Sequence, residues 1–171
     1  DEELLIELIN ANPDTRFVIA PHEMEEARIN RILSDVKCGA VRYTQCDTQT
    51  DFSHTQVLVL DTIGILSSVY GYASWSYIGG GFGVGIHNTL EAATFGLPIA
   101  FGTNYEKFKE ARDMVALGAA TSVSSAAELA AWFVPLRDDE AYLAKASAIA
   151  KDYTAKNQGA TSLFMKVAFP E

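Results

Sequence analysis

The sequence has few cations, two cysteines and no long apolar run. Of its 171 residues, 13 are Lys or Arg against 22 Asp or Glu, so the formal net charge is -9, and the cations are scattered along the chain. Such a surface disfavours nucleic-acid phosphates and anionic lipids, and we expect neither nucleic acid nor membrane to bind through this segment. No run is long enough for a membrane-spanning helix, and no signal peptide is visible.

Several motifs of known chemistry are also missing. Cys38 and Cys46 are too few for a disulfide framework and lack metal-ligand spacing, which favours two reduced thiols in a cytosolic protein. No Gly-Lys-Ser/Thr follows the glycine-rich stretch, and no glycines follow the first predicted strand, so the nucleotide-triphosphatase and dehydrogenase readings are weakened. No Ser-His-Asp or Cys-His pairing supports covalent hydrolysis.

The apolar pattern predicts one α/β domain. A chain of 171 residues with 49% hydrophobic content can bury one sizeable core. Short continuous apolar runs alternate with helical stretches, which is typical of a parallel sheet covered by helices on both faces. The expected strands are 17–20, a weak candidate at 41–43, 57–60, 75–78, 97–101 and 120–123; the expected helices are 2–10, 24–33, 66–73, 88–95, 107–117, 126–136 and 139–156.

The stretch 77–102 predicts a ligand site. A strand ends at Ile78, glycines follow at five of the next seven positions, and a helix is expected to open at His87-Asn88. Glycines let the backbone approach a ligand closely, and the first turn of a helix leaves free amides, so this loop can hold an anion or a nucleotide. In parallel sheets the site lies beyond the carboxyl ends of the strands, where the loops 21–23 and 61–64 also emerge.

Individual residues at these strand ends have structural and functional interpretations. Asn88 and Glu91 have the spacing of a capping box, which starts a helix, and the same pair can bind phosphate and ribose. For His87 we favour ligand contact over a purely structural role, whereas for His22 the two stay balanced. Asp61 is either a catalytic base or a turn former.

These residues carry a family resemblance. Residues 79–82, 85–93, 95–98 and 101–102 resemble the donor-binding core of the bacterial 3-deoxy-D-manno-octulosonic acid (Kdo) transferases, and residues 61–64 are similar to the family's Asp-Thr-x-Gly segment. The family's Gly-His-Asn-x-Leu-Glu pattern is matched with Ile86 in place of the glycine. The glycine loop, Glu91 and residues 96–98 are shared by many GT-B glycosyltransferases, but the His-Asn pair with the Asp-Thr-x-Gly segment is more specific.

The resemblance implies the Rossmann-like C-terminal half of a GT-B enzyme of lipopolysaccharide biosynthesis. Residues 1–171 would form a single nucleotide-sugar donor-binding domain that binds CMP-Kdo, for transfer of Kdo to a lipid A precursor at the cytoplasmic face of the inner membrane. We expect a fragment that lacks the N-terminal acceptor-binding domain, with no catalytic residue of its own, no metal, no cofactor beyond the donor substrate, and no activity in isolation.

The resemblance also implies roles for particular residues. Thr62, Ile63 and Gly64 would contact the cytidine, Asn88 the phosphate and Glu91 the ribose. The full expected donor-binding set is His22, Thr62, Ile63, Gly64, Gly80, Gly81, His87, Asn88, Thr89 and Glu91. Two positions depart from the family: Pro21 stands where an arginine commonly precedes the histidine, and Ile65 replaces an acidic residue.

Two alternatives stay open at this point. One is a GT-B glycosyltransferase that uses a UDP-sugar, or a sugar-nucleotide epimerase with a similar glycine loop. The other is a binding module with a degenerate nucleotide site and no chemistry. The apolar segment 160–169 either packs on this domain or, if its apolar face is exposed, marks a lost partner.

Overall fold

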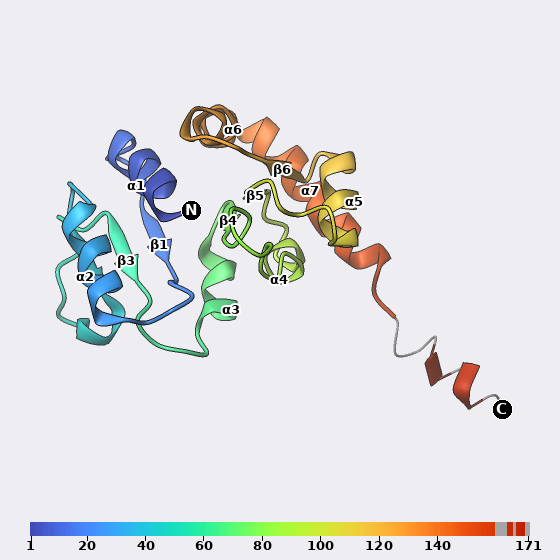
Figure 1. Ribbon diagram of the computed structural model, residues 1–171, viewed down its shortest axis with the longest axis horizontal. Helices are drawn as coiled ribbons and strands as arrows, with labels where there is room; N and C mark the ends of the chain where they lie inside the picture. The colour runs from blue at the N-terminus through green and yellow to red at the C-terminus, as the bar shows by residue number, and fades with distance from the viewer. Residues whose placement is uncertain (160–163, 166, 170–171) are drawn as a thin grey trace. The chain divides into compact units, whose positions relative to one another are not determined.

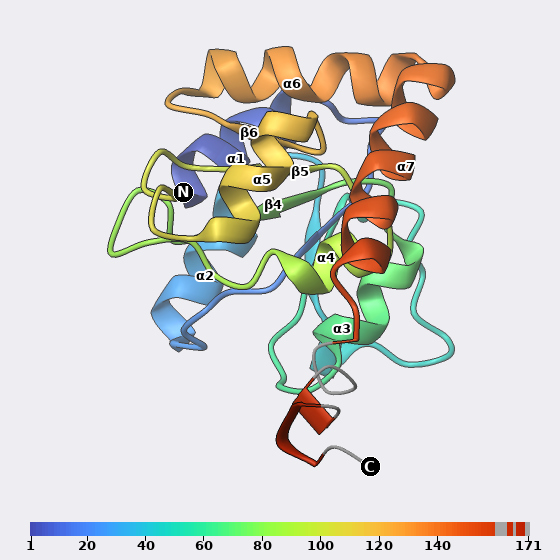
Figure 2. The same cartoon turned by 90° about the vertical axis from the view of Figure 1, so that its right-hand side faces the viewer.

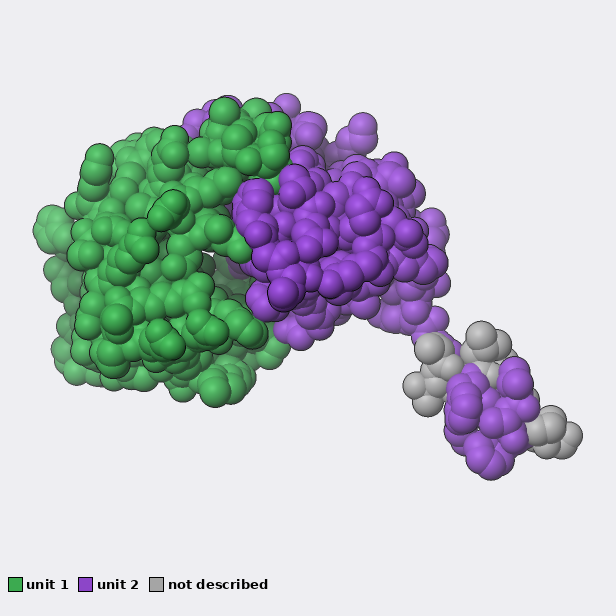
Figure 3. All heavy atoms as spheres, in the orientation of Figure 1, with its two compact units in different colours: residues 1–72, 123–131 green, residues 73–122, 132–171 purple. Residues whose placement is uncertain are grey.

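A computed structural model describes residues 1–159, 164–165 and 167–169. The chain divides into two compact units: unit 1 comprises Asp1–Tyr72 and Val123–Ala131, and unit 2 comprises Ala73–Ser122 and Trp132–Glu171 (Figure 3). The sequence predicts that residues 1–171 form a single domain. The division into two units does not test this expectation, which stays a prediction.

Unit 1 is built on a three-stranded parallel sheet with the order β1-β3-β2. The weak strand candidate at 41–43 is confirmed as β2, although it starts and ends one residue earlier. The elements of this unit, apart from the start of α6, are α1 (Glu2–Ala11), β1 (Phe17–Ile19), α2 (Glu26–Asp35), β2 (Ala40–Arg42), the 3-10 helix η1 (Tyr43–Gln45), β3 (Val57–Val59), α3 (Leu66–Val69) and the 3-10 helix η2 (Tyr70–Tyr72) (Figure 1).

The core of unit 1 follows from the periodicity of its helices. Ile29 and Ile32 lie one turn apart on α2 and are both buried, as expected of an amphipathic helix. A buried glutamine then connects α1 to the sheet, because Gln56 Nε2 donates to the carbonyls of Ile9 and Asn12, each at 2.8 Å. This contact fixes the end of α1 beside the start of β3.

Unit 2 is built on a second three-stranded parallel sheet, with the order β4-β5-β6. Helix α7 contacts both α4 and α5 (Figure 2). The remaining elements are β4 (Ser76–Ile78), α4 (Leu90–Thr94), β5 (Ile99–Phe101), α5 (Lys109–Leu117), β6 (Ala120–Ser122), α6 (Ala126–Asp138), which begins in unit 1 and ends in unit 2, and α7 (Glu140–Lys156).

Local sequence explains the ends of these helices. Helix α5 ends at Gly118, whose φ of 83° is the left-handed conformation that glycine adopts at helix C-termini. Helix α7 begins after Asp139, whose carboxylate accepts from the amide of Tyr142 at 3.0 Å. The core of unit 2 includes three fully buried side chains, those of Phe101, Met114 and Phe133.

The parallel α/β class predicted from the sequence is confirmed, with strands in two sheets of three and helices on both sides. None of the helices in the described ranges has the length and apolar character that a bilayer crossing needs. The expectation for segment 160–169 lies partly outside the described residues; within it, Phe164, Val167 and Phe169 are exposed.

Candidate functional site

In unit 1, two predicted loops emerge at the same edge of the sheet. Strands β1 and β3 are parallel neighbours, with Ile19 opposite Val59, so the chain leaves both strands in the same direction. His22 follows β1, and Thr62, Ile63 and Gly64 follow β3. Ile63 is 87% exposed and Gly64 has a φ of 95° with no atom near its missing side chain, so this loop can be approached from solvent.

Asp61 is held by a residue that the sequence did not single out. Its carboxylate accepts from the amide of Thr44 at 2.9 Å and from the hydroxyl of Thr44 at 2.6 Å. Partial burial raises the pKa of Asp61, but these hydrogen bonds and the charge of Arg42 together bring the pKa below its usual value. A carboxylate with a lowered pKa is a poor general base near neutral pH, which favours the structural interpretation of Asp61.

In unit 2, the glycine loop (residues 79–89) folds back on itself directly after β4. The carbonyl of Gly80 accepts from the amides of Gly83 and Gly85 at 3.0 and 3.2 Å, and the amide of His87 donates to Gly79 at 3.0 Å. Gly80 and Gly85 have φ values of 91° and 137°, which residues with side chains rarely adopt. The glycines therefore serve the shape of the loop itself.

The glycine loop also lies against the segment that follows β5. A Cβ on Gly81 would lie 2.5 Å from the amide nitrogen of Gly102, and a Cβ on Gly80 would lie 2.4 Å from the carbonyl oxygen of Gly85. The same Cβ on Gly80 would be 3.3 Å from Nε2 of His87, so the imidazole lies over this glycine. Strands β4 and β5 are parallel neighbours, which brings the two loops to one sheet edge.

Two residues of that second loop were missed by the sequence analysis. The main-chain amide of Asn104 donates to Gly81 O at 2.8 Å, and its side-chain Nδ2 donates to Gly83 O at 2.7 Å. Lys107 Nζ donates to the carbonyl of Val84. Both residues follow β5, a buried parallel strand that pairs with β4. Their position after the carboxyl end of a strand was the one feature of the sequence that could have indicated a part in the site.

The start of α4 differs from the prediction. The helix was expected at 88–95 with Asn88 as its N-cap, but it spans Leu90–Thr94 with Thr89 at the N-cap position. The reason is a tighter local turn, because Asn88 Oδ1 accepts from the amide of Leu90 at 3.0 Å. Asn88 Nδ2 donates to Glu91 Oε1 at 2.8 Å, so these two predicted residues do lie together. A helix of five residues adds little dipole, and the loop amides are the better anion donors.

Thr89 belongs to the predicted donor-binding set, but its side chain is buried. It is only 1% exposed, and within the described part of the chain its hydroxyl has no hydrogen-bond partner. A direct side-chain contact with a ligand would therefore require the loop to move. His87, Asn88 and Glu91 are exposed, so their side chains are accessible as they stand.

The ten predicted residues thus form two groups. In unit 1, the residues beyond the carboxyl ends of β1 and β3 are His22, Thr62, Ile63 and Gly64. In unit 2, the residues beyond the carboxyl end of β4 are Gly80, Gly81, His87, Asn88, Thr89 and Glu91. In the described ranges, no group of three or more His, Cys, Asp or Glu side chains could hold a metal ion.

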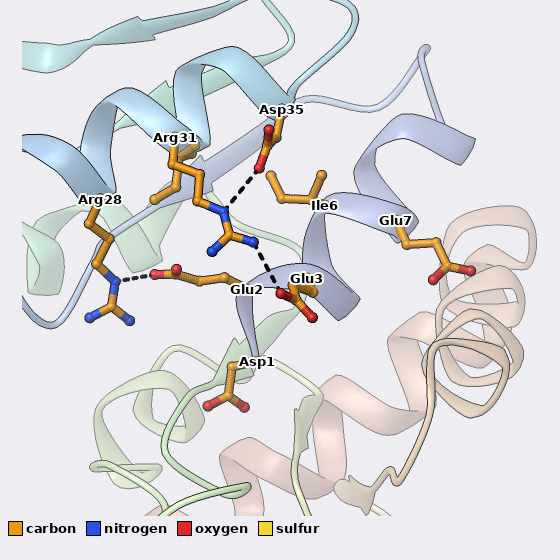
Figure 4. Close-up of a pocket in the computed structure, with 9 residues that line it drawn as sticks. Asp1, Glu2, Glu3, Ile6, Glu7, Arg28, Arg31 and Asp35 are labelled. Carbon is orange, nitrogen blue, oxygen red and sulfur yellow. Dashed lines mark hydrogen bonds and ion pairs between the residues drawn. The ribbon is translucent and has the colours of Figure 1, made fainter.

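Two hollows of unit 1 lie away from these residues. A groove of about 490 Å³ between α1 and α2 is lined by charges that pair with one another, including Arg31 with Glu3 at 3.0 Å and with Asp35 at 3.5 Å (Figure 4). A second hollow, lined by Arg16 and Gln56 among others, lies where the strands begin and not where they end. Neither contains a predicted site residue, so we place the candidate site at the carboxyl ends of the strands.

Comparison with curated proteins finds relatives that include several 3-deoxy-D-manno-octulosonic acid transferases. The chain is 34% identical over 110 residues to a 3-deoxy-D-manno-octulosonic acid transferase of Bordetella pertussis, covering 63% of this chain and 26% of the relative. It is 32% identical over 113 residues to the protein of that name from Rickettsia typhi, covering 63% and 24%. The chain therefore spans about a quarter of the length of these relatives. No protein-family model matches it.

The fold has a solved counterpart. The structure matches the crystal structure of the C-terminal CMP-Kdo binding domain of WaaA from Acinetobacter baumannii with a TM-score of 0.68 and 22% identity, covering 86% of this chain and 79% of that one. At this identity the likeness establishes the fold. The sequence analysis found a resemblance to the Kdo transferases in the residues of the glycine loop. The curated relatives and this fold together confirm that resemblance.

Proposed function

We propose that this chain is the donor-binding part of a glycosyltransferase that transfers 3-deoxy-D-manno-octulosonic acid from CMP-Kdo to a lipid A precursor at the cytoplasmic face of the bacterial inner membrane. The observation that carries the proposal is the 34% identity over 110 residues to a transferase of that name. The isolated chain is expected to bind the CMP-sugar without transferring the sugar.

The geometry of unit 2 supports a phosphate and ribose site. The exposed Asn88 amide and the glycine-loop amides provide neutral donors for a phosphate, and such preorganised donors stabilise the charge that develops on a departing CMP. Glu91 keeps one carboxylate oxygen outside its bond to Asn88, and that oxygen can accept from the ribose hydroxyls. For the cytidine, the resemblance to the Kdo transferases points to Thr62, Ile63 and Gly64.

The test is a calorimetric titration of the chain with CMP and, separately, with UMP. Cytosine presents a donor at position four of its ring and uracil presents an acceptor, so a site built for one rejects the other. We expect CMP to bind more tightly than UMP. Preference for UMP would instead support the UDP-sugar transferase or epimerase, and binding of neither would support the degenerate module.

Variants at the start of α4 tell whether the nucleotide uses this site. Glu91→Ala removes a charged acceptor, which costs roughly 1.5–3 kcal/mol when it accepts from a ligand. Glu140→Ala, at an exposed glutamate in the first turn of α7, changes the charge equally and serves as the matched control. If both variants bind CMP like the wild type, the site lies elsewhere. Repeating the titration with EDTA tests the expected independence from metal.

A further inference from the structure

Three hydrogen bonds hold the glycine loop from one side. They run from Asn104 and Lys107, in the segment between β5 and α5, to the carbonyls of Gly81, Gly83 and Val84. Two of these bonds come from side chains, Asn104 Nδ2 and Lys107 Nζ, and the third comes from the main-chain amide of Asn104. The two residues therefore determine which way its peptide planes face.

The orientation of these planes follows from peptide geometry. The described residues include no cis peptide bond, and in a trans peptide the N–H points opposite to the carbonyl of the same plane. Since Asn104 binds the carbonyls of Gly81 and Gly83, the amides that follow them, those of Phe82 and Val84, face away from Asn104. Among the residues that the structure describes, neither amide has a protein acceptor.

Phe82 and Val84 are both exposed, at 42% and 87%. The amides of Phe82 and Val84, which both face away from Asn104, are called the donor surface, because main-chain amides in a glycine-rich turn can bind phosphate and carboxylate oxygens. Here the donor surface stands at the carboxyl end of β4, on the loop that carries the predicted nucleotide site.

Lys107 contributes charge at the same place. Its ammonium group binds Val84 O, and a Cβ on Gly85 would lie 2.9 Å from its Nζ. Within the described ranges Lys107 forms no ion pair, whereas Lys109 and Lys156 are each paired with an aspartate. In a chain of net charge -9, an unpaired cation on this loop raises its affinity for anions.

We propose that Asn104 and Lys107 are positioning residues for an anion that binds the Phe82 and Val84 amides: Asn104 orients the two amides, and Lys107 fixes the loop and supplies a positive charge beside it. In the context of the proposed function, on which this assignment rests, the anion is the phosphate of the CMP-sugar. The chemistry recognised is a phosphate monoester or diester oxygen.

The first arm of the test uses inorganic phosphate and the amide NMR spectrum. We expect the resonances of Phe82 and Val84 to shift on titration in the wild type. The apparent Kd should rise about tenfold in Lys107→Gln, as expected for one lost charge-assisted contact. It should also rise in Asn104→Ala, which loses the Nδ2 bond that orients the Gly83–Val84 peptide and keeps the main-chain bond to Gly81 O. Lys107→Arg should restore binding, and Lys145→Gln, at an exposed lysine of α7 with the same change of charge, should leave it unaltered. Absence of a shift at both amides in the wild type would overturn the proposal.

The second arm compares CMP with cytidine, which lacks the phosphate. Lys107→Gln should weaken CMP about tenfold and leave cytidine unchanged, because a general loss of structure would weaken both. If Lys107→Gln binds CMP as the wild type does, the positioning role is wrong while the proposed function stands. If phosphate shifts both amides but CMP binds no more tightly than phosphate, the proposed function is wrong while the positioning role stands. Should Asn104→Ala lose its dispersed spectrum, the Lys107 variants decide alone.

Discussion

Tyr153 of α7 donates its hydroxyl to Asp113 of α5 at 3.0 Å, and this bond connects two helices of unit 2. Burial, followed by the bond to Asp113, raises the pKa of Tyr153 to about 12. Asp113 has a lowered pKa because Lys109 and then Tyr153 donate to it. Each partner is thus stabilised in the protonation state that keeps the bond.

Tyr153→Phe should lower the free energy of unfolding by roughly 1.5–3 kcal/mol at pH 7, since the variant loses one hydrogen bond to a charged group. Because the pKa of about 12 in the folded state exceeds the value near 10 of an unfolded tyrosine, the stabilisation is complete below about pH 10 and is lost as the pH rises through 12. Denaturant unfolding between pH 7 and 12 measures both effects. Tyr142→Phe, at an exposed tyrosine of the same helix, is the control, and an equal loss there would contradict the assignment.

Gly81→Ala should disrupt the glycine loop, because the added Cβ would lie 2.5 Å from the backbone of Gly102. We expect a loss of about 1–3 kcal/mol in the free energy of unfolding, the usual range for overpacking. Gly83→Ala is the matched control two residues away, since its Cβ would meet nothing closer than 3.6 Å. Thermal unfolding of both variants checks this. Equal stability of the two would mean that the close approach is relaxed in solution.

Thr44→Val should raise the pKa of Asp61, because the variant keeps the amide donor and loses the hydroxyl donor at 2.6 Å. The lowered pKa of Asp61 contributes stability that is present above the unfolded value near 3.9 and is lost as the pH falls through the folded value. The difference in unfolding free energy between pH 7 and pH 3 should therefore shrink in Thr44→Val and recover in Thr44→Ser. A carboxyl NMR titration of Asp61 gives the pKa directly, and an unchanged value would refute the role of Thr44.

Asn88→Asp should separate the fold of the α4 start from nucleotide binding. The aspartate keeps the acceptor for the Leu90 amide but replaces the donor to Glu91 with a second carboxylate. Two carboxylates in contact raise one pKa and repel a phosphate, so the proposed CMP affinity should fall by tenfold or more, which is about 1.4 kcal/mol. Thermal stability, by contrast, should stay close to that of the wild type. Calorimetry with CMP and a melting curve give the two readouts, and unchanged affinity would move the phosphate away from Asn88.

The sequence was sufficient to predict the parallel α/β class, because short apolar runs such as 57–60 are bounded by turn residues and followed by helices. The glycine loop after Ile78 was also predictable, since five glycines have few other uses at the end of a strand. The exact start of α4 was not, because Asn88 can cap a helix or form a tighter turn, and the choice depends on Glu91 and Leu90 in three dimensions. Asn104 and Lys107 carry no local motif, and only the pairing of β4 with β5 brings them to the loop.

Unit 1 includes Val123–Ala131, which the chain reaches only after strands β1 to β6. Val123 and Leu129, from this returning segment, are almost completely buried. During synthesis, the first 72 residues leave the ribosome long before the piece that completes their unit. Unit 1 can therefore be completed only after strands β4 to β6 of unit 2 have been made. A chain truncated before Val123 should expose the apolar surface that Val123 and Leu129 cover, and it should be cleaved faster by proteases.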